Sequence, residues 1–444
     1  LSSSGECVTL FLGALFFMVK IEPQNLRGFR DFGASEAGAR SLIFKKVRAV
    51  FERYGFLPME TPALEYKEIL AGKYGREGEK LMYAFKDQGG RDVAMRYDLT
   101  VPLARYFAQN QNDLPLPFKR YQIAPVWRAD RPQKGRFREF TQCDIDVVGS
   151  GSLFADAEVI VCINSALKEL GIPEVLIKIN NRKLLDGLVK EAEVNVNKSA
   201  DVIRILDKLE KMGEKVVREE LALAGINTKQ RQALFELLNQ DFQDPQDFVS
   251  RFEGIEGAGE LAEVLEILLD MGVKNYQVDL TLARGLDYYT GSIFEFVLPD
   301  AREFGSVAGG GRYDNLIGTF VGKPVPAVGC SIGVDRLLDA LEELELVKYD
   351  IVSDVLVCNL DEKLTQKYLQ IVTELRAAGI KTDFYYESAK LDKQLKYADK
   401  KNINFAVLIG EKEEKASEAA VKNLATGKQE SVKQRDLVIK LRSK

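Results

Sequence analysis

The sequence contains no histidine among its 444 residues. This absence excludes hydrolases that use a histidine base, histidine proton shuttles and nearly all common zinc-enzyme ligand sets. Five cysteines are present (Cys7, Cys143, Cys162, Cys330 and Cys358), and no two have C-x-x-C spacing. Such scattered cysteines are typical of reduced thiols in a cytoplasmic protein, so we expect neither disulfides nor a transition-metal site. Any chemistry must therefore depend on Arg, Lys, Asp, Glu, Tyr and backbone amides.

The sequence also lacks a long apolar run. The strongest candidate, CVTLFLGALFFMV at residues 7–19, is too short to span a bilayer comfortably, and no basic segment precedes it as in a signal peptide. Met18 and the VKIEPQNLRGFRDF around residues 19–32 read like a natural start. We therefore interpret residues 1–17, an unmatched leader segment, as translated from upstream of the natural start rather than as a real leader peptide or a membrane anchor, and we expect no membrane partner.

The remaining composition is that of a soluble globular protein, with 46% hydrophobic and 29% charged residues. The length predicts two to four domains. The net charge is −5, yet residues 351–444 hold 18 Lys and Arg against 14 Asp and Glu. A basic carboxy-terminal unit on an acidic protein is a modest indication of a polyanionic partner.

Periodicity predicts an α+β unit followed by an α/β unit. Residues 35–54 have helical spacing, with Ser35 as a plausible cap and Gly55 as a stop. Residues 118–128 and 137–149 predict an antiparallel strand pair with a long loop, and a helix follows at 154–170.

Later segments predict a helical block inserted into this β-rich unit. Residues 180–271 contain amphipathic helices rich in Glu and Lys, and β signals return at 276–297. Residues 326–344 predict a strand followed by a helix. From residue 351 strands and helices alternate, which predicts a small α/β domain with a mostly parallel sheet.

Three arginines outside charge runs are candidates for binding one anionic ligand. Arg128 ends a predicted strand, Arg284 precedes Gly285 in LARGLDYYTG, and Arg336 begins a predicted helix. Structural alternatives remain open: an ion pair of Arg128 with Asp130 or Asp146, and a pair of Asp335 with Arg336. No P-loop and no complete GxGxxG is present, so a nucleotide held by arginines and glycine backbones fits best.

The surrounding residues favour a small polar substrate beside that anion. Asp98 and Asp146 could accept from an ammonium or a ring N–H. The glycines of AGGGRYDNL, before Tyr313, allow close approach to a flat ligand. Strand alternation would place Tyr288 and Tyr289 on opposite faces, and the alternative is a plain tyrosine-rich strand.

Several linked segments resemble one family. RYQIAPVWRADRPQKGRFREFTQCDIDVVG resembles motif 2 of class II aminoacyl-tRNA synthetases, PAVGCSIGVDRL resembles motif 3, and YGFLPMETPAL resembles motif 1 with Pro62. LARGLDYYTG and GGGRYDNL resemble the two signature peptides of histidyl-tRNA synthetases, and LDKQLKYADKKNINFAVLIGE resembles their anticodon-binding domain. The resemblance runs from Met18 to Lys444 in the expected order.

The resemblance implies a class II catalytic domain with an antiparallel sheet, a helical insertion and a carboxy-terminal α/β anticodon-binding domain. It divides the chain into a catalytic core at 18–179 and 272–346, an insertion at 180–271 and the anticodon-binding domain at 351–444. It implies a cytoplasmic homodimer that activates histidine with ATP, accompanied by Mg²⁺, and transfers it to tRNA-His.

The resemblance also implies roles for individual residues. Arg128 and Arg336 would hold ATP phosphates, Arg136 would assist ATP and the acceptor end, and Arg284 would stabilise the reacting α-phosphate. Arg128 and Arg284 are thus the expected catalytic pair. The expected histidine-binding set is Asp98, Leu99, Thr100, Arg128, Gln142, Asp146, Arg284, Tyr288, Tyr289 and Tyr313, with no protein-held metal. Thr141 and Asp146 depart from the family pattern, which leaves the effect on selectivity open.

Three alternatives follow from the same resemblance. One is a non-aminoacylating paralogue such as the regulatory subunit of ATP phosphoribosyltransferase, which typically lacks the anticodon domain and the catalytic arginine. A second is a tRNA-binding sensor with an inactive catalytic fold. A third is a class II synthetase specific for another amino acid, such as proline or threonine.

Overall fold

The computed structural model describes residues 22–239, 245–283, 288–347 and 353–442. The leader at 1–17, Cys7 and Arg284 lie outside these ranges. Within them no helix combines the length and the apolar character needed to cross a membrane.

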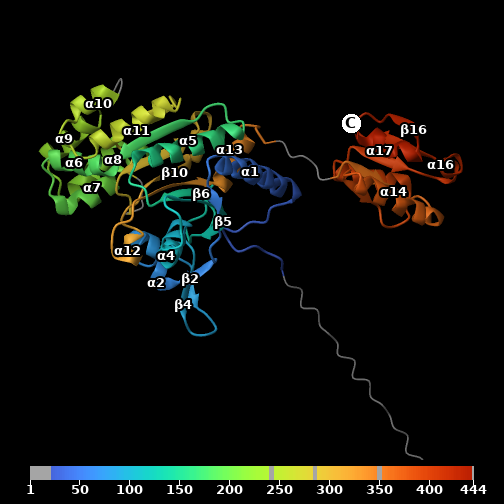
Figure 1. The fold of residues 1–444 in the computed structure, drawn as a ribbon, viewed down its shortest axis with the longest axis horizontal. Coiled ribbons are helices and arrows are strands. Elements are labelled where there is room, and N and C mark those ends of the chain that lie inside the picture. The colour runs from blue at the N-terminus through green and yellow to red at the C-terminus, as the bar shows by residue number, and fades with distance from the viewer. Residues whose placement is uncertain (1–21, 240–244, 284–287, 348–352, 443–444) are drawn as a thin grey trace, which may run out of the picture.

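An eight-stranded mixed sheet is the centre of the larger unit (Figure 1). Its strands, in spatial order, are β1 (Leu57–Pro58), β5 (Phe118–Trp127), β6 (Glu139–Val148), β11 (Ala327–Gly333), β10 (Ser306–Arg312), β9 (Ser292–Val297), β7 (Leu176–Asn181) and β8 (Tyr276–Val278). Only the end pairs, β1 with β5 and β7 with β8, are parallel. The predicted antiparallel sheet and the β5–β6 pair are therefore confirmed.

One face of this sheet packs against α1 (Ala34–Arg53), α5 (Leu153–Glu169), α11 (Ala258–Asp270) and α13 (Val334–Glu343). Tyr121, Cys143 and Ile145 of the sheet join Val47 and Ile160 of these helices in one buried core. The helix predicted at 35–54 is thus confirmed, but its cap is Gly33 rather than Ser35. Gly55, with φ +76°, ends the turn that follows.

The opposite face of the sheet carries α4 (Thr100–Asn110) and a three-stranded sheet. The strand order of that sheet is β2 (Leu64–Tyr66), β4 (Asp92–Met95) and β3 (Ala84–Lys86). The same part of the structure contains the short helices α2 (Lys67–Leu70), α3 (Gly75–Lys80) and α12 (Gly318–Val321). Figure 1 shows these elements on the side of β5 and β6 away from α5.

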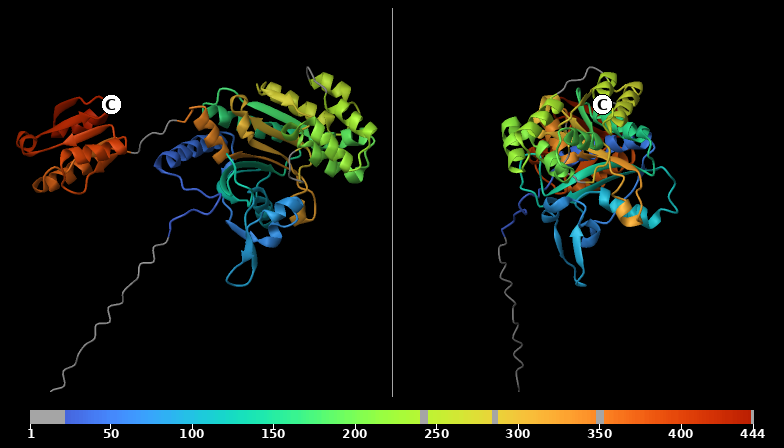
Figure 2. Two further views of the ribbon diagram at one scale, coloured as in Figure 1. Left: turned by 180° about the vertical axis from the view of Figure 1, so that it is seen from behind. Right: turned by 90° about the vertical axis from the view of Figure 1, so that its left-hand side faces the viewer.

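A helical block follows β7, as the amphipathic pattern predicts. Its helices are α6 (Arg182–Glu191), α7 (Ser199–Leu206), α8 (Leu209–Leu223), α9 (Thr228–Leu238) and α10 (Pro245–Arg251). They lie together beside one end of the sheet in all views (Figures 1 and 2).

The carboxy-terminal unit has its own five-stranded sheet and cores. The order is β13 (Thr382–Phe384), β12 (Val355–Val357), β14 (Phe405–Leu408), β15 (Glu418–Asn423) and β16 (Gln429–Lys433), with helices α14 (Thr365–Ala377), α15 (Leu391–Lys400), α16 (Glu411–Ala416) and α17 (Leu437–Arg442). Pairs between β13, β12 and β14 are parallel, but β15 and β16 are antiparallel. The prediction of a mostly parallel sheet is therefore right only for its first half.

Candidate active site

The floor of the candidate site is the sheet face beneath α4. Because side chains alternate along β6, Gln142, Asp144 and Asp146 share this face while Cys143 and Ile145 point into the core. Leu99, at the cap of α4, is fully buried and packs over Ala124 and Val126 rather than opening into the site.

Asp146 is held from two sides. The hydroxyl of Tyr313 donates to its Oδ1, and Nη2 of Arg120 lies 2.7 Å from its Oδ2. Arg120 is itself wholly buried and also donates to the carbonyl of Leu99 at 3.0 Å. The carboxyl group fits here because a Cβ on Gly329 would lie only 1.9 Å from Asp146 Oδ1. Asp146 therefore pairs with Arg120, and its proposed ion pair with Arg128 is wrong.

Asp98 lies in the loop above this floor and binds the first turn of α4. Its Oδ1 accepts from the backbone N–H of Val101 at 3.0 Å and from the Tyr74 hydroxyl at 3.1 Å. Its Oδ2 is buried and accepts no hydrogen bond from any residue that the structure describes. Thr100 begins the helix directly after this loop and is half-buried. Asp98 thus offers a fixed carboxylate oxygen that a ligand can satisfy.

Three tyrosine rings form a wall beside the floor. The ring centroid of Tyr288 lies 5.0 Å from that of Tyr289 and 6.0 Å from that of Tyr313. Neither Tyr288 nor Tyr289 belongs to a strand, since β9 begins at Ser292, so the prediction of opposite strand faces is wrong. Gly311 leaves room for this packing, because its Cβ would lie 2.8 Å from the Tyr289 ring.

Arg128 lies just beyond β5 with its guanidinium partly exposed. Nε donates to the carbonyl of Tyr97 at 3.0 Å, and the guanidinium carbon lies 4.3 Å from the Tyr97 ring centroid and 5.2 Å from that of Phe140. Among the described residues no carboxylate is within 4.0 Å of this guanidinium, so the pair with Asp130 is also wrong. The ring stacking fixes the side chain, while its terminal nitrogens retain donors for an anion.

In the basic loop between β5 and β6, some basic side chains bind the protein backbone and others are exposed to solvent. Arg138 donates to the carbonyls of Asp130 at 3.1 Å and Arg27 at 3.2 Å, so it anchors the chain. Arg131 and Arg136 are exposed, and Arg136 forms two backbone hydrogen bonds with Gln133 across the loop tip. Lys134 lies 3.4 Å from Glu343.

Arg336 projects from the first turn of α13. Its Nη1 donates to the carbonyl of Ser306 at 2.5 Å, and Gly135 of the basic loop packs against its side chain. Asp335 instead accepts from Arg30 at 2.8 Å and Arg40 at 2.9 Å. The alternative pair of Asp335 with Arg336 is therefore wrong.

Asp144 is the buried acid that the sequence analysis missed. It lies between Gln142 and Asp146 on the same face of β6, and alternation of polar residues along that strand was the signal that could have found it. Thr141 lies on the other face, where its hydroxyl accepts from Arg40 at 2.7 Å and its N–H donates to Asp335. Thr141 consequently does not border the site.

Burial dominates the electrostatics of this site. It raises the pKa of Asp98 and Asp146, and it raises the pKa of Asp144 to about 7, against the lowering effect of Arg120. Burial, with the neighbouring carboxylates next, also holds the pKa of Tyr74 and Tyr313 well above 10.0. These tyrosines therefore remain hydrogen-bond donors.

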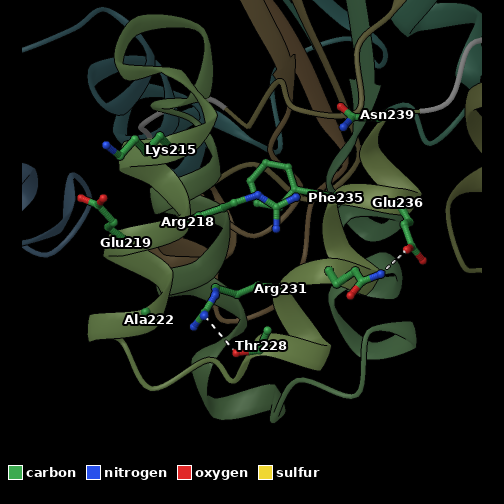
Figure 3. A pocket seen from close by; sticks show the side chains of 10 residues that line it. Lys215, Arg218, Glu219, Ala222, Thr228, Arg231, Phe235, Glu236 and Asn239 are labelled. Carbon is green, nitrogen blue, oxygen red and sulfur yellow. Dashed lines mark hydrogen bonds between the residues drawn. The ribbon is translucent and has the colours of Figure 1, made fainter.

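A separate cleft of about 860 Å³ lies between α8 and α9 (Figure 3). Its walls carry Lys215, Arg218 and Arg231 together with Glu219 and Glu236. None of the predicted site residues lines it.

Comparisons with known proteins agree on one family. The family model described as histidyl-tRNA synthetase matches residues 28–337, and the one described as anticodon binding domain matches residues 354–444. A histidine–tRNA ligase of Cytophaga hutchinsonii is 41% identical over 95% of this chain and 99% of its own. That of Wolinella succinogenes is 43% identical over 92% of this chain and 95% of its own.

Solved structures give the same result. The crystal structure of histidyl-tRNA synthetase from Nostoc sp. PCC 7120 has a TM-score of 0.83 and 35% identity, and the match covers 96% of this chain and 100% of that chain. A protein from Bacillus halodurans C described as an ATP phosphoribosyltransferase regulatory subunit/histidyl-tRNA synthetase has a TM-score of 0.73. At 22% identity, over 86% of this chain and 96% of its own, that likeness shows the fold alone.

Proposed function

The chain belongs to the histidyl-tRNA synthetase family, and on that premise we propose that it activates histidine with ATP and transfers it to the 3′ end of tRNA-His. The observation that carries the proposal is a set of buried polar atoms that have no hydrogen-bond partner among the described residues: Gln142 Oε1 and Asp144 Oδ1 on the sheet face, and Asp98 Oδ2 in the loop above it. Such atoms are costly unless a ligand satisfies them.

In the first step a carboxylate oxygen of histidine attacks the α-phosphorus of ATP and pyrophosphate leaves. Arg128 and Arg336 would hold phosphate oxygens, and Arg136 at the exposed loop tip would assist ATP and the acceptor end of tRNA. Arg284 would stabilise the charge that develops on the α-phosphate. Placing cations in advance where charge develops accelerates in-line displacement.

Histidine itself would lie between the loop before α4 and the tyrosine wall. Asp98, with Thr100 at the helix start, would bind the α-ammonium group, whereas Leu99 is buried against Ala124 and Val126. Gln142, Asp146, Tyr288, Tyr289 and Tyr313 would form the amino-acid pocket. A site built on hydrogen bonds to the substrate can reject apolar analogues by about 10⁴–10⁵.

Mg²⁺ would enter with ATP rather than on a protein site. Among the described residues no group of three His, Cys, Asp or Glu side chains is arranged to hold a metal ion. The ion would neutralise phosphate charge.

We place the protein in the cytoplasm as a homodimer. The segment after α1 and the small sheet expose the large apolar side chains Leu57, Leu64, Tyr66 and Phe85. Exposed apolar side chains of this size support a subunit interface. Sedimentation equilibrium at micromolar concentration tests it, and a monomer would overturn it.

The regulatory paralogue is disfavoured because the chain matches the anticodon-binding model over residues 354–444. The deciding experiment is ATP–pyrophosphate exchange with each of the twenty amino acids, using wild type and Arg284→Ala. We expect exchange with histidine only, lost in the variant. No exchange with any amino acid, despite ATP binding, would favour a regulatory or sensor role.

A further inference from the structure

Three buried acceptor atoms of the candidate site have neither a hydrogen-bond donor nor an ion-pair partner among the described residues: Asp98 Oδ2, Gln142 Oε1 and Asp144 Oδ1. A fourth, Asp146 Oδ2, also lacks a hydrogen bond but lies 2.7 Å from Nη2 of Arg120. The proposed function gives roles to Asp98 and Gln142 but leaves Asp144 without one. Asp144 is nearly as buried as Asp98, since each is 3% exposed. An ionisable oxygen in this position needs an explanation.

Asp144 occupies the middle of the site floor. In the sheet it pairs with Gln122 of β5 and Ser331 of β11. The side chain of Gln122 turns to Thr61, to which it donates at 3.1 Å. Asp144 accepts a hydrogen bond from Ser331, whose hydroxyl oxygen in turn accepts from Gln142 Nε2 at 2.6 Å. This chain of bonds fixes both side chains and leaves one oxygen of each unsatisfied.

The two arginines near Asp144 are each paired with another group. Arg120 from β5 and Arg96 from the end of β4 face it, as do the carboxylates of Asp98 and Asp146. Arg120 forms its ion pair with Asp146 at 2.7 Å. Arg96 donates to the backbone carbonyls of Thr61 at 2.5 Å and Pro125 at 2.9 Å. Burial makes the charged form of Asp144 costly, and a cationic ligand would favour it.

We propose that Asp144 is a substrate-binding residue that holds the α-ammonium group of histidine together with Asp98 and Gln142. The inference rests on the proposed function. An ammonium group has three N–H donors and one positive charge, which match three bare acceptors of which two are carboxylates. Asp146 differs, because its Oδ1 accepts from the Tyr313 hydroxyl and its Oδ2 is paired with Arg120 at 2.7 Å.

The test is Asp144→Asn in the full-length protein, which keeps the shape and removes the charge. In ATP–pyrophosphate exchange we expect KM for histidine to rise about tenfold or more, since hydrogen bonds to charged groups are the stronger ones. KM for ATP should stay within about twofold. Asp113→Asn, on an exposed turn, is the matched control and should change neither constant.

Two competitive inhibitors separate the ammonium from the imidazole. Histidinol keeps the ammonium group, whereas imidazolepropionate lacks it but keeps the ring. Asp144→Asn should weaken inhibition by histidinol about tenfold and leave inhibition by imidazolepropionate unchanged. Equal weakening of both would overturn the proposal, because it would place Asp144 at the ring or in a merely structural role.

The outcomes also separate this inference from the proposed function. If the wild type exchanges with histidine and Asp144→Asn has the same KM for it, the ammonium role of Asp144 is wrong while the synthetase assignment stands. If the wild type exchanges with no amino acid, the proposed function itself fails. An unchanged melting temperature in the variant excludes misfolding as the cause of a higher KM.

Discussion

Gly329 decides whether the pocket floor can hold Asp146. A Cβ at this position would lie 1.9 Å from Asp146 Oδ1 and 2.6 Å from its Cγ. Gly329→Ala must therefore push the carboxyl group away from Tyr313 and Arg120. We expect a loss of about 1–3 kcal/mol in the free energy of unfolding, as for overpacked cores, and a higher KM for histidine in pyrophosphate exchange.

Gly38 provides the matched control for that substitution. It lies within α1, and a Cβ there would meet no atom within 4 Å. Gly38→Ala should stabilise the protein by about 0.5–1 kcal/mol through helix propensity. If urea unfolding showed Gly329→Ala to be as stable as wild type, with normal KM, the close packing of Asp146 on β11 would be wrong.

Asp144 also gives stability a definite pH dependence. Its pKa in the folded protein is about 7, above the value of 3.8 expected for the unfolded chain. The raised pKa therefore stabilises the folded protein fully below pH 3.8. This contribution to the free energy of unfolding is lost as the pH rises from 3.8 to about 7. The slope approaches about 1.4 kcal/mol per pH unit within that window.

We expect the free energy of unfolding of wild type to fall between pH 5 and pH 8 more steeply than that of Asp144→Asn, which cannot titrate here. Urea unfolding at each pH, without ligand, measures the difference. Parallel curves for the two proteins would contradict a raised pKa at Asp144.

At the scale of elements, Asp335 ties α13 to β6 and α1. One carboxylate oxygen accepts from Arg30 at 2.8 Å and Arg40 at 2.9 Å, and the other accepts from the N–H of Thr141 at 2.7 Å. Asp335→Asn leaves Arg40 without its anion and Arg30 with only the 3.5 Å contact to Asp339, and breaking a buried pair costs about 3–5 kcal/mol. Because Arg336 is the next residue of α13, KM for ATP should also rise.

Asp339→Asn, one turn along α13, is the control for Asp335. Its carboxylate lies 3.5 Å from Nη1 of Arg30, which retains the stronger pair with Asp335. Loss of such a partly exposed contact costs about 1 kcal/mol or less. The test is to compare the thermal unfolding and the KM for ATP of the two variants. Equal effects would mean that Asp335 does not hold α13 in place.

Regular elements with a clear period could be predicted from the sequence. The strands around Arg128 and Gln142 alternate, and α1 and α5 show helical spacing, so local pattern and tertiary packing agree there. Tyr288 and Tyr289 were misread because aromatic residues favour strands, whereas here their packing with Tyr313 and over Gly311 holds them outside one.

The errors at the site have a common physical cause. Strand alternation indicates that Asp144 and Asp146 share a face, but not which cation reaches them. Arg120 does so because β5 pairs with β6 in the register that sets Arg120 opposite Asp146. Register depends on the whole sheet, so the pairing with Arg128 could not be excluded from sequence. In the carboxy-terminal unit, the alternation of strands and helices predicted a mostly parallel sheet. The last two strands, β15 and β16, instead form an antiparallel hairpin.

At the scale of the whole molecule, the described residues form separate hydrophobic cores. The clusters of the carboxy-terminal unit draw only on residues from 355 to 441, and those of the larger unit draw only on residues from 39 to 347. Each unit therefore buries its own apolar surface, which is the physical requirement for independent folding.

This separation predicts that a chain ending at residue 347 folds and still catalyses ATP–pyrophosphate exchange with histidine, because every described residue of the candidate site precedes that point. Charging of tRNA should fall by about 10²–10⁴ in kcat/KM, since a second binding site on the same ligand contributes avidity of that order. Comparing exchange and aminoacylation in the truncated and full-length proteins measures both effects. Loss of exchange would show that the larger unit needs the carboxy-terminal one to fold, and undiminished charging would remove that unit from tRNA recognition.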